Sequence, residues 1–136
     1  MKRFTTAAVA IACLSTPAFA AEQAMFRETG SDAERALVTA SKDFADNIKA
    51  GVVDPAQIGI ATLDVNGDGV KEIFVHDYNS FSCGSAGCAT YIYRNDGGAL
   101  TTLMYVVAGD TIAVGDNATN NNGYKDIYIK GGDGAP

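Results

Sequence analysis

The sequence predicts an α+β fold, in which an N-terminal amphipathic helix packs on an antiparallel β-sheet meander of about five or six short strands. Apolar residues recur at helical spacing in the N-terminal part of the chain. After Pro55 the sequence changes to short β-branched and aromatic runs separated by Gly, Asn and Asp. The polar turns between these runs are brief, which favours antiparallel neighbours over βαβ crossovers.

Residues 1–20 have the pattern of an export signal. Lys2 and Arg3 form a charged start, a short apolar stretch follows, and Ala18-Phe19-Ala20 offers a small-x-small cleavage site. The apolar stretch is too short to span a bilayer, and we expect no transmembrane segment. The sequence therefore predicts a periplasmic or secreted protein that is cleaved near Ala20.

The rest of the chain has the length of one domain. We expect a flexible N-terminal segment over 21–30, a single α+β domain over 31–130 and a flexible tail over 131–136. A competing interpretation makes Cys13 a lipid attachment site. The preceding residues are a poor lipobox, and cleavage there would halve the apolar stretch of the signal.

The charge balance limits the classes of partner. The chain has a formal net charge of −6 at pH 7, and removal of the signal would make it more acidic because two basic residues would be lost. Scattered Lys and Arg residues offer no surface for a phosphate backbone, so we expect no nucleic acid partner. An acidic surface fits calcium ligation or contact with a basic envelope protein.

The first element of the domain is predicted to be a helix of about five turns. Ser31 and Glu34 have the spacing of a capping box, and Gly51 is a natural stop. The apolar face would consist of Ala33, Leu37, Ala40, Phe44 and Ile48.

Six strands are predicted after this helix. Asn95-Asp96-Gly97-Gly98 has the composition of a hairpin loop, and Gly109-Asp110 of another reversal. The predicted strands cover 58–63, 72–76, 89–94, 101–107, 111–114 and 126–130.

Cys83 and Cys88 are the two cysteines outside the signal. An even number in an exported chain favours a disulfide, and the intervening glycines let the chain fold back. The alternative is a redox pair, which needs a lowered thiol pKa and usually the tighter C-x-x-C spacing.

The loop between the first two predicted strands carries the strongest chemical signal. Oxygen-bearing side chains occur at alternate positions of Asp64-Val65-Asn66-Gly67-Asp68-Gly69-Val70-Lys71-Glu72. Such a loop can supply six or seven hard oxygens, which suits one Ca²⁺ ion. The expected ligands are Asp64, Asn66, Asp68, the carbonyl of Val70, and Glu72. The alternative is an Asx-rich hairpin whose side chains accept hydrogen bonds from their own backbone amides.

This segment resembles the calcium loop of FG-GAP and VCBS-type repeats, whose pattern is D-x-D/N-x-D-G-x-x-D/E before an apolar strand. The resemblance implies a strand–loop–strand site that binds calcium through these residues. An EF-hand would instead place an acid at position 12, which here is Val75. The chain is too short for the blades of a propeller. More loosely, it is similar to small exported bacterial proteins of unassigned function.

A weaker copy of the pattern occurs near the C-terminus. Asn122, Gly123 and Asp126 align with positions 5, 6 and 9 of the first loop, but position 1 is Ala118, which has no side-chain oxygen. We interpret this segment as a polar turn before the last strand, with a second metal site as the alternative.

The six tyrosines and Phe81 lie in or near the predicted strands. We interpret them as core residues or cross-strand partners, and the absence of Trp weakens a carbohydrate-binding interpretation. They are Tyr78, Phe81, Tyr91, Tyr93, Tyr105, Tyr124 and Tyr128.

The sequence favours a non-catalytic, calcium-binding module, such as an inhibitor or immunity-type protein, over an enzyme. A disulfide-closed loop loses little conformational entropy on binding a partner. Its contact residues would be Asn79, Ser80, Phe81, Ser82, Gly84 and Ser85. One alternative is an envelope hydrolase that uses surface carboxylates near His76, Asp77 and Asp110, although the sequence has no G-x-S-x-G elbow. A purely structural envelope component is the other.

Overall fold

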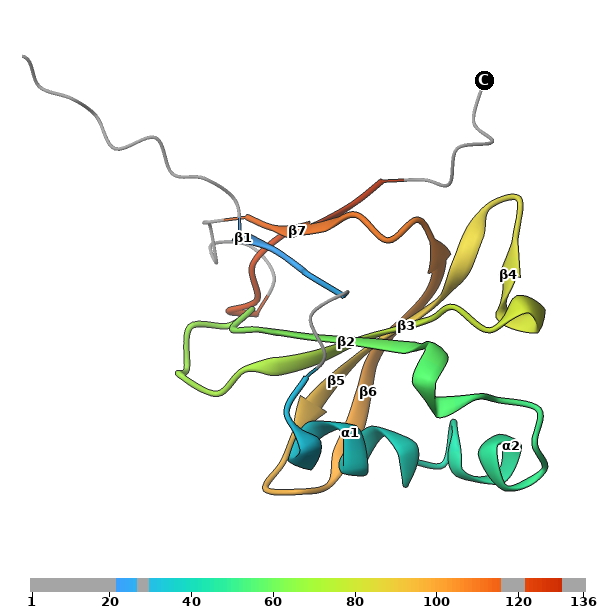
Figure 1. Cartoon of the computed structure of the whole chain (residues 1–136). Helices are drawn as coiled ribbons and strands as arrows, with labels where there is room; N and C mark the ends of the chain where they lie inside the picture. Colours follow the sequence, from blue (N-terminus) through green and yellow to red (C-terminus); the bar gives the residue numbers. More distant parts are fainter. Residues whose placement is uncertain (1–21, 27–29, 116–121, 131–136) are drawn as a thin grey trace, which may run out of the picture.

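The computed structural model describes residues 22–26, 30–115 and 122–130. It is mainly β, with eight strands in two antiparallel sheets and only short helices (Figure 1). The prediction of an α+β fold built on a long N-terminal helix is therefore wrong. The predicted signal 1–20, Cys13 and the predicted tail 131–136 lie outside the described residues.

The larger sheet contains most of the predicted strands. Its order is β2–β3–β5, and both β4 and β6 pair with β5. The strands are β2 (Ile58–Leu63), β3 (Glu72–Asp77), β4 (Cys83–Gly84), β5 (Gly87–Asn95) and β6 (Leu100–Ala108).

The smaller sheet has the order β1–β7–β8 and consists of β1 (Glu22–Gln23), β7 (Ile112–Val114) and β8 (Ile127–Ile129). The last two predicted strands exist, but they do not continue the first sheet. They pair with the N-terminal residues instead, and the amide of Ala24 extends this pairing by donating to the carbonyl of Ile112 at 2.8 Å. The N-terminal segment that we expected to be flexible thus contributes a strand.

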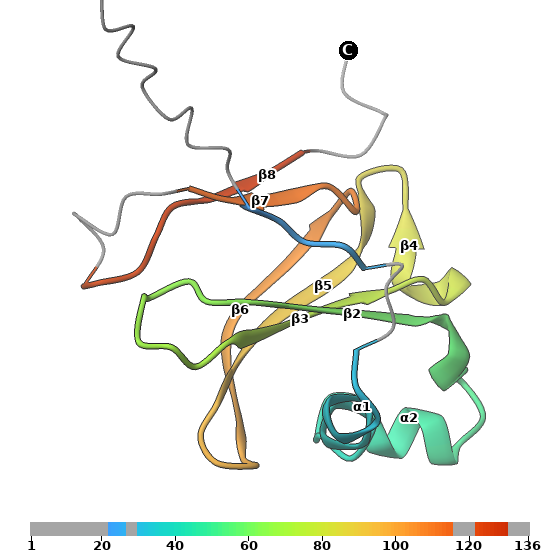
Figure 2. The same cartoon turned by 60° about the vertical axis from the view of Figure 1, so that its left-hand side comes forward.

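The larger sheet lies between two layers (Figures 1 and 2). The smaller sheet covers one face, where Ile112 and Val114 pack with Phe74 and Ile92. The helical segment covers the other face. Because β3 is central, all six of its residues are buried.

The helical segment is divided in two. Helix α1 (Asp32–Thr39) begins with the predicted capping box: the amide of Glu34 donates to Ser31 Oγ at 3.3 Å, and that of Ser31 donates to Glu34 Oε2 at 2.8 Å. Helix α2 (Ala45–Lys49) is followed by Gly51 at φ +71°, which confirms the predicted stop. Two single-turn 3₁₀ helices, η1 (Pro55–Gln57) and η2 (Ser80–Ser82), complete the elements.

The predicted five-turn helix breaks near Ser41. The hydroxyl of Thr39 bonds back to the carbonyl of Arg35 at 2.9 Å, and the amide of Ser41 reaches only to Val38, as in a 3₁₀ turn. The break lets Phe44 leave the helical path and enter the core. The predicted apolar face was wrong in its first half, where Val38 is buried while Ala33 and Ala40 are exposed. Phe44 and Ile48 of that face do pack against the sheet.

Among the described residues, the helices are all too short and too polar to span a bilayer.

Cys83 and Cys88 form a disulfide, as predicted, with an S–S distance of 2.02 Å. They are directly opposite each other in the β4–β5 hairpin, and Gly84 and Gly87 form the next pair. Gly87 has φ +116°, and a Cβ atom there would lie 2.0 Å from the carbonyl oxygen of Ala108 on β6. Only glycine allows β6 to approach the hairpin so closely.

We expect Gly87→Ala to lower the free energy of unfolding by about 3 kcal/mol or more, because positive φ and overlap with backbone act together. Gly84→Ala is the matched control, since it faces open space, and should change stability by less than about 1 kcal/mol. Urea unfolding of both variants measures the difference. Equal stability of the two variants would contradict this account of the hairpin.

Candidate metal centre

The candidate metal loop, residues 64–71, connects β2 to β3. Leu63 and Glu72 are the last paired residues of the two strands, so the loop closes a hairpin, as the predicted strand–loop–strand arrangement requires. Gly67 and Gly69 have φ values of +73° and +84°, which allows the chain to turn back twice within a few residues.

The carboxylate of Asp64 organises the first half of the loop. Its Oδ1 accepts hydrogen bonds from the amides of Asn66 (3.2 Å) and Gly67 (2.6 Å), and its Oδ2 accepts one from Gly69 (3.0 Å). Burial alone would raise the pKa of Asp64, but these three amides, with Lys125, lower it overall. Asp64 is therefore held as a carboxylate that faces into the loop.

The next two side chains repeat this arrangement at steps of two residues. Asn66 Oδ1 accepts from the amide of Asp68 at 3.0 Å, and Asp68 Oδ1 accepts from the amide of Val70 at 2.7 Å. These contacts form the Asx-rich hairpin that was the alternative to a metal loop. The side chain of Val70 is about half exposed.

Glu72 is the buried acid of the site, with only 1% of its surface exposed. Its Oε2 accepts from the amide of Val65 at 3.0 Å. The side-chain nitrogen of Asn66 lies 3.0 Å from Asp68 Oδ2 and 3.5 Å from Glu72 Oε1, so three predicted ligands meet at this amide. Burial raises the pKa of Glu72, and the nearby carboxylates of Asp68 and Asp64 raise it further.

Lys125 joins the loop from a distant part of the sequence. Its ammonium group donates to the carbonyl of Asp64 at 3.0 Å, and its backbone amide donates to the carbonyl of Val65 at 2.7 Å. Lys125 was not predicted as a site residue, and no local sequence pattern marks it, because the contact spans about sixty residues of the chain.

The donor types fit a calcium ion. In the described part of the chain, no three His, Cys, Asp or Glu residues are grouped as direct metal ligands, and the Asn66 amide nitrogen faces both Asp68 and Glu72. Rotation of that amide would present its oxygen. A carboxylate oxygen has two lone pairs, so it can accept a backbone amide and still bind a cation. The amide contacts of Asp64 and Asp68 are therefore compatible with a calcium loop, whereas rotation of Asn66 would exchange its bond to the Asp68 amide for a bond to the ion.

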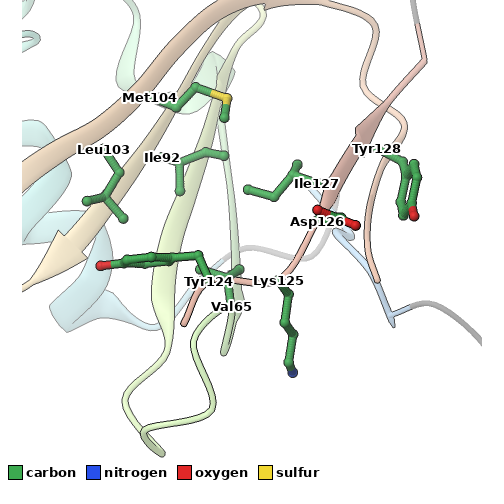
Figure 3. Close-up of a pocket in the computed structure, with 9 residues that line it drawn as sticks. All are labelled: Val65, Ile92, Leu103, Met104, Tyr124, Lys125, Asp126, Ile127 and Tyr128. Carbon is green, nitrogen blue, oxygen red and sulfur yellow. The ribbon is translucent and has the colours of Figure 1, made fainter. Parts of the chain in front are cut away.

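The C-terminal copy of the pattern leads into β8. Asn122 (φ +53°) and Gly123 (φ +90°) form a turn, as interpreted from the sequence, while Ala118 lies outside the described residues. Just beyond this turn is a mainly apolar cavity of about 550 Å³. Figure 3 shows Ile92 and Met104 on one side and Ile127 on the other. This cavity is the open end of the core between the two sheets.

The predicted partner loop, residues 79–85, contains residues that are bonded to the rest of the domain and residues that are exposed. Asn79 is buried, and its side chain bonds to both backbone groups of Asp54 (2.8 and 3.2 Å). The hydroxyl of Ser82 donates to Asp77 Oδ2. The exposed residues are Ser80, Phe81, Gly84 and Ser85.

The residues of the hydrolase alternative occupy different environments. His76 is buried between the rings of Phe26 and Tyr78, and its Nδ1 lies 2.7 Å from Thr90 Oγ1. Burial lowers the pKa of His76, against the smaller opposite effects of two carboxylates. Asp77 is also buried, so it is not the surface carboxylate that this alternative requires.

Comparison of the chain with models of protein families, with curated proteins and with solved structures found no match.

Glu72→Gln should stabilise the metal-free protein at pH 7 by about 1 kcal/mol, because it removes a buried negative charge and keeps an oxygen for the Val65 amide. A raised folded-state pKa contributes stability below the usual value of 4.5, and this contribution is lost as the pH rises through the folded value. The two chains should therefore converge near pH 4. Urea unfolding in chelator between pH 4 and 7.5 measures both trends. A variant less stable than wild type at pH 7 would contradict the charge argument.

Proposed function

We propose that this protein is an exported calcium-binding module that acts by binding a partner rather than by catalysis. The observation that carries the proposal is the convergence of Asp68, Asn66 and the buried Glu72 in a loop already ordered by Asp64. Calcium would be held by these four side chains and the carbonyl of Val70. The ion would supply positive charge to the three carboxylates and cross-link the β2–β3 hairpin.

Two further observations support the exported binding module. The resemblance of residues 64–73 to FG-GAP and VCBS-type loops favours a structural calcium ion. The Cys83–Cys88 disulfide fits an oxidising compartment such as the periplasm. Ligation by protein oxygens leaves little room for a catalytic water, so the ion stabilises the fold in this proposal.

The proposed contact surface is the disulfide loop, residues 79–88. Asn79 and Ser82 fix its base, while Phe81 is 59% exposed at its surface. A rigid loop with an exposed aromatic residue loses little entropy on binding. The acidity of the chain favours a basic partner, for which a lysozyme-like envelope hydrolase is the proposed class.

Calcium should stabilise the folded domain by about 2.7 kcal/mol at roughly 100 times its dissociation constant, a shift of several degrees in thermal unfolding. Asp68→Ala should remove the shift between calcium and chelator. Asn122→Ala should retain it, although this variant starts from lower stability. A wild-type protein that unfolds at the same temperature in calcium and chelator would exclude the calcium proposal.

An excess of the protein should slow the clearing of a cell-wall suspension by a basic lysozyme. Phe81→Ala should raise the concentration needed for half inhibition at least about tenfold, as for an aromatic hot spot. Tyr128→Ala, at an equally exposed aromatic residue on β8, is the matched control and should inhibit like wild type. Unchanged clearing at low salt with excess protein would contradict the inhibitor proposal.

A further inference from the structure

A second concave site lies on the helical side of the larger sheet. It is a hollow of about 300 Å³ between the start of α2, the disulfide loop and the strands β5 and β6. We call it the aromatic hollow, and its principal lining residues are Asp43, Phe44, Asp77, Phe81, Tyr91 and Tyr105.

The hollow exists because the helices cover only part of the sheet. Val38 and Phe44 pack over β2, β3 and the inner part of β5. In the register of β5 with β6, Tyr105 is opposite Tyr91 and lies beyond this cover. Tyr105 is consequently 57% exposed.

Tyr91 is the centre of a group of aromatic rings. Its ring centroid lies 5.0 Å from that of Tyr105, 5.2 Å from that of Phe44, and 5.8 Å from that of Tyr93, with which it is stacked. Phe81 adds an exposed ring from the disulfide loop. The hollow is therefore lined by aromatic rings, of which Phe81 and Tyr105 are the exposed ones.

Two carboxylates contribute to the same hollow. Asp43 Oδ2 accepts the hydroxyl of Tyr93 at 2.9 Å. Asp77 is fixed by the side chains of Asn79 and Ser82. Both acids line the hollow together with Tyr91. Burial raises the pKa of the Tyr91 hydroxyl, and Tyr105 and the two carboxylates raise it further.

No basic side chain of the described lining neutralises the two acids of the hollow. Among the described residues, its lining contains two acids and no Lys or Arg. An anion would be repelled, and a neutral apolar group would cover the two acids without supplying the opposite charge that they lack. A cation gains from the carboxylates and from the ring faces together.

The size and shape of the hollow narrow the class of cation. Its volume is at the lower end of the range for ligand pockets, roughly 300–1,000 Å³, which suits one side chain better than a cofactor. A planar guanidinium can stack on an aromatic ring while its N–H groups point to a carboxylate, and a compact ammonium cannot do both. We propose that the aromatic hollow binds the guanidinium group of an arginine side chain presented by a partner protein.

This proposal deepens the binding role proposed for residues 79–88 and rests on it, because Phe81, Ser82 and Cys83 belong to both. The partner would insert one arginine beside the disulfide loop. The rest of the loop would then exclude water from around the ion pair.

The test is an NMR titration of the full mature chain, in calcium and in chelator, with the peptide acetyl-Gly-Arg-Gly-amide. The tyrosine ring signals of Tyr91 and Tyr105 should shift and saturate with a dissociation constant of the order of 1 mM. A twin peptide with citrulline, which has the same shape without the charge, should bind at least about tenfold more weakly. A lysine twin should bind at least about threefold more weakly.

Paired variants locate the site. Tyr105→Ala and Asp43→Asn should each weaken binding at least about fivefold, while Tyr105→Phe, which keeps the ring, should bind like wild type. The controls are Tyr128→Ala and Asp46→Asn, at exposed positions outside the hollow, and both should leave binding unchanged.

Three results would overturn the proposal: equal binding of the arginine and citrulline peptides, equal binding of the arginine and lysine peptides, or shifts confined to Tyr124 and Tyr128 beside the other cavity. The titration uses neither a hydrolase nor a calcium shift as its readout. Arginine binding without lysozyme inhibition would therefore refute the inhibitor proposal alone, and inhibition without arginine binding would refute the hollow alone.

Discussion

The buried hydrogen bond between the Glu72 carboxylate and the Val65 amide determines the shape of the loop that connects β2 to β3. A carboxylate that is almost fully buried has to be paired, because burial of an unpaired charge costs several kcal/mol. The amide of Val65, at 3.0 Å, and the more distant Asn66 side chain provide that pairing. They fold residues 64–71 back over the start of β3, which brings the other polar side chains of the loop together.

The same residue connects this loop to the rest of the molecule. The side chain of Val65 lies in the core between the two sheets, and its carbonyl accepts the amide of Lys125. Lys125 lies two residues before β8, the strand that pairs with β7. A cation in the loop would therefore stabilise the hairpin, the core and the entry to β8 together, which explains why global unfolding is a suitable measure of calcium binding.

The features that depend on neighbouring residues were predictable from the sequence. The capping box at Ser31, the disulfide and the strands of the larger sheet follow from local patterns. The prediction of one long helix was wrong. The spacing of apolar residues does not show that the Thr39 hydroxyl will compete for the backbone carbonyl of Arg35 and so favour a break in the helix. The second sheet requires Glu22 and Gln23 to pair with β7. A strand of two residues is too short to show the alternation of apolar and polar residues that would predict it. The aromatic hollow is lined by four separate segments of the chain. The sequence shows that its tyrosines exist, but it does not show that they lie together.

The two proposed sites lie at opposite ends of one strand. Glu72 begins β3 and belongs to the metal loop, and Asp77 ends β3 and faces the aromatic hollow. Five steps along a strand span about 17 Å, and at an effective dielectric constant of about 20 two unit charges at that distance interact by only about 1 kcal/mol. A calcium ion would therefore change the potential in the hollow very little. Its effect there would be mechanical. Calcium would stabilise β3, which is buried along its whole length, and would thereby help to hold Asp77 in the position in which the hollow receives a cation.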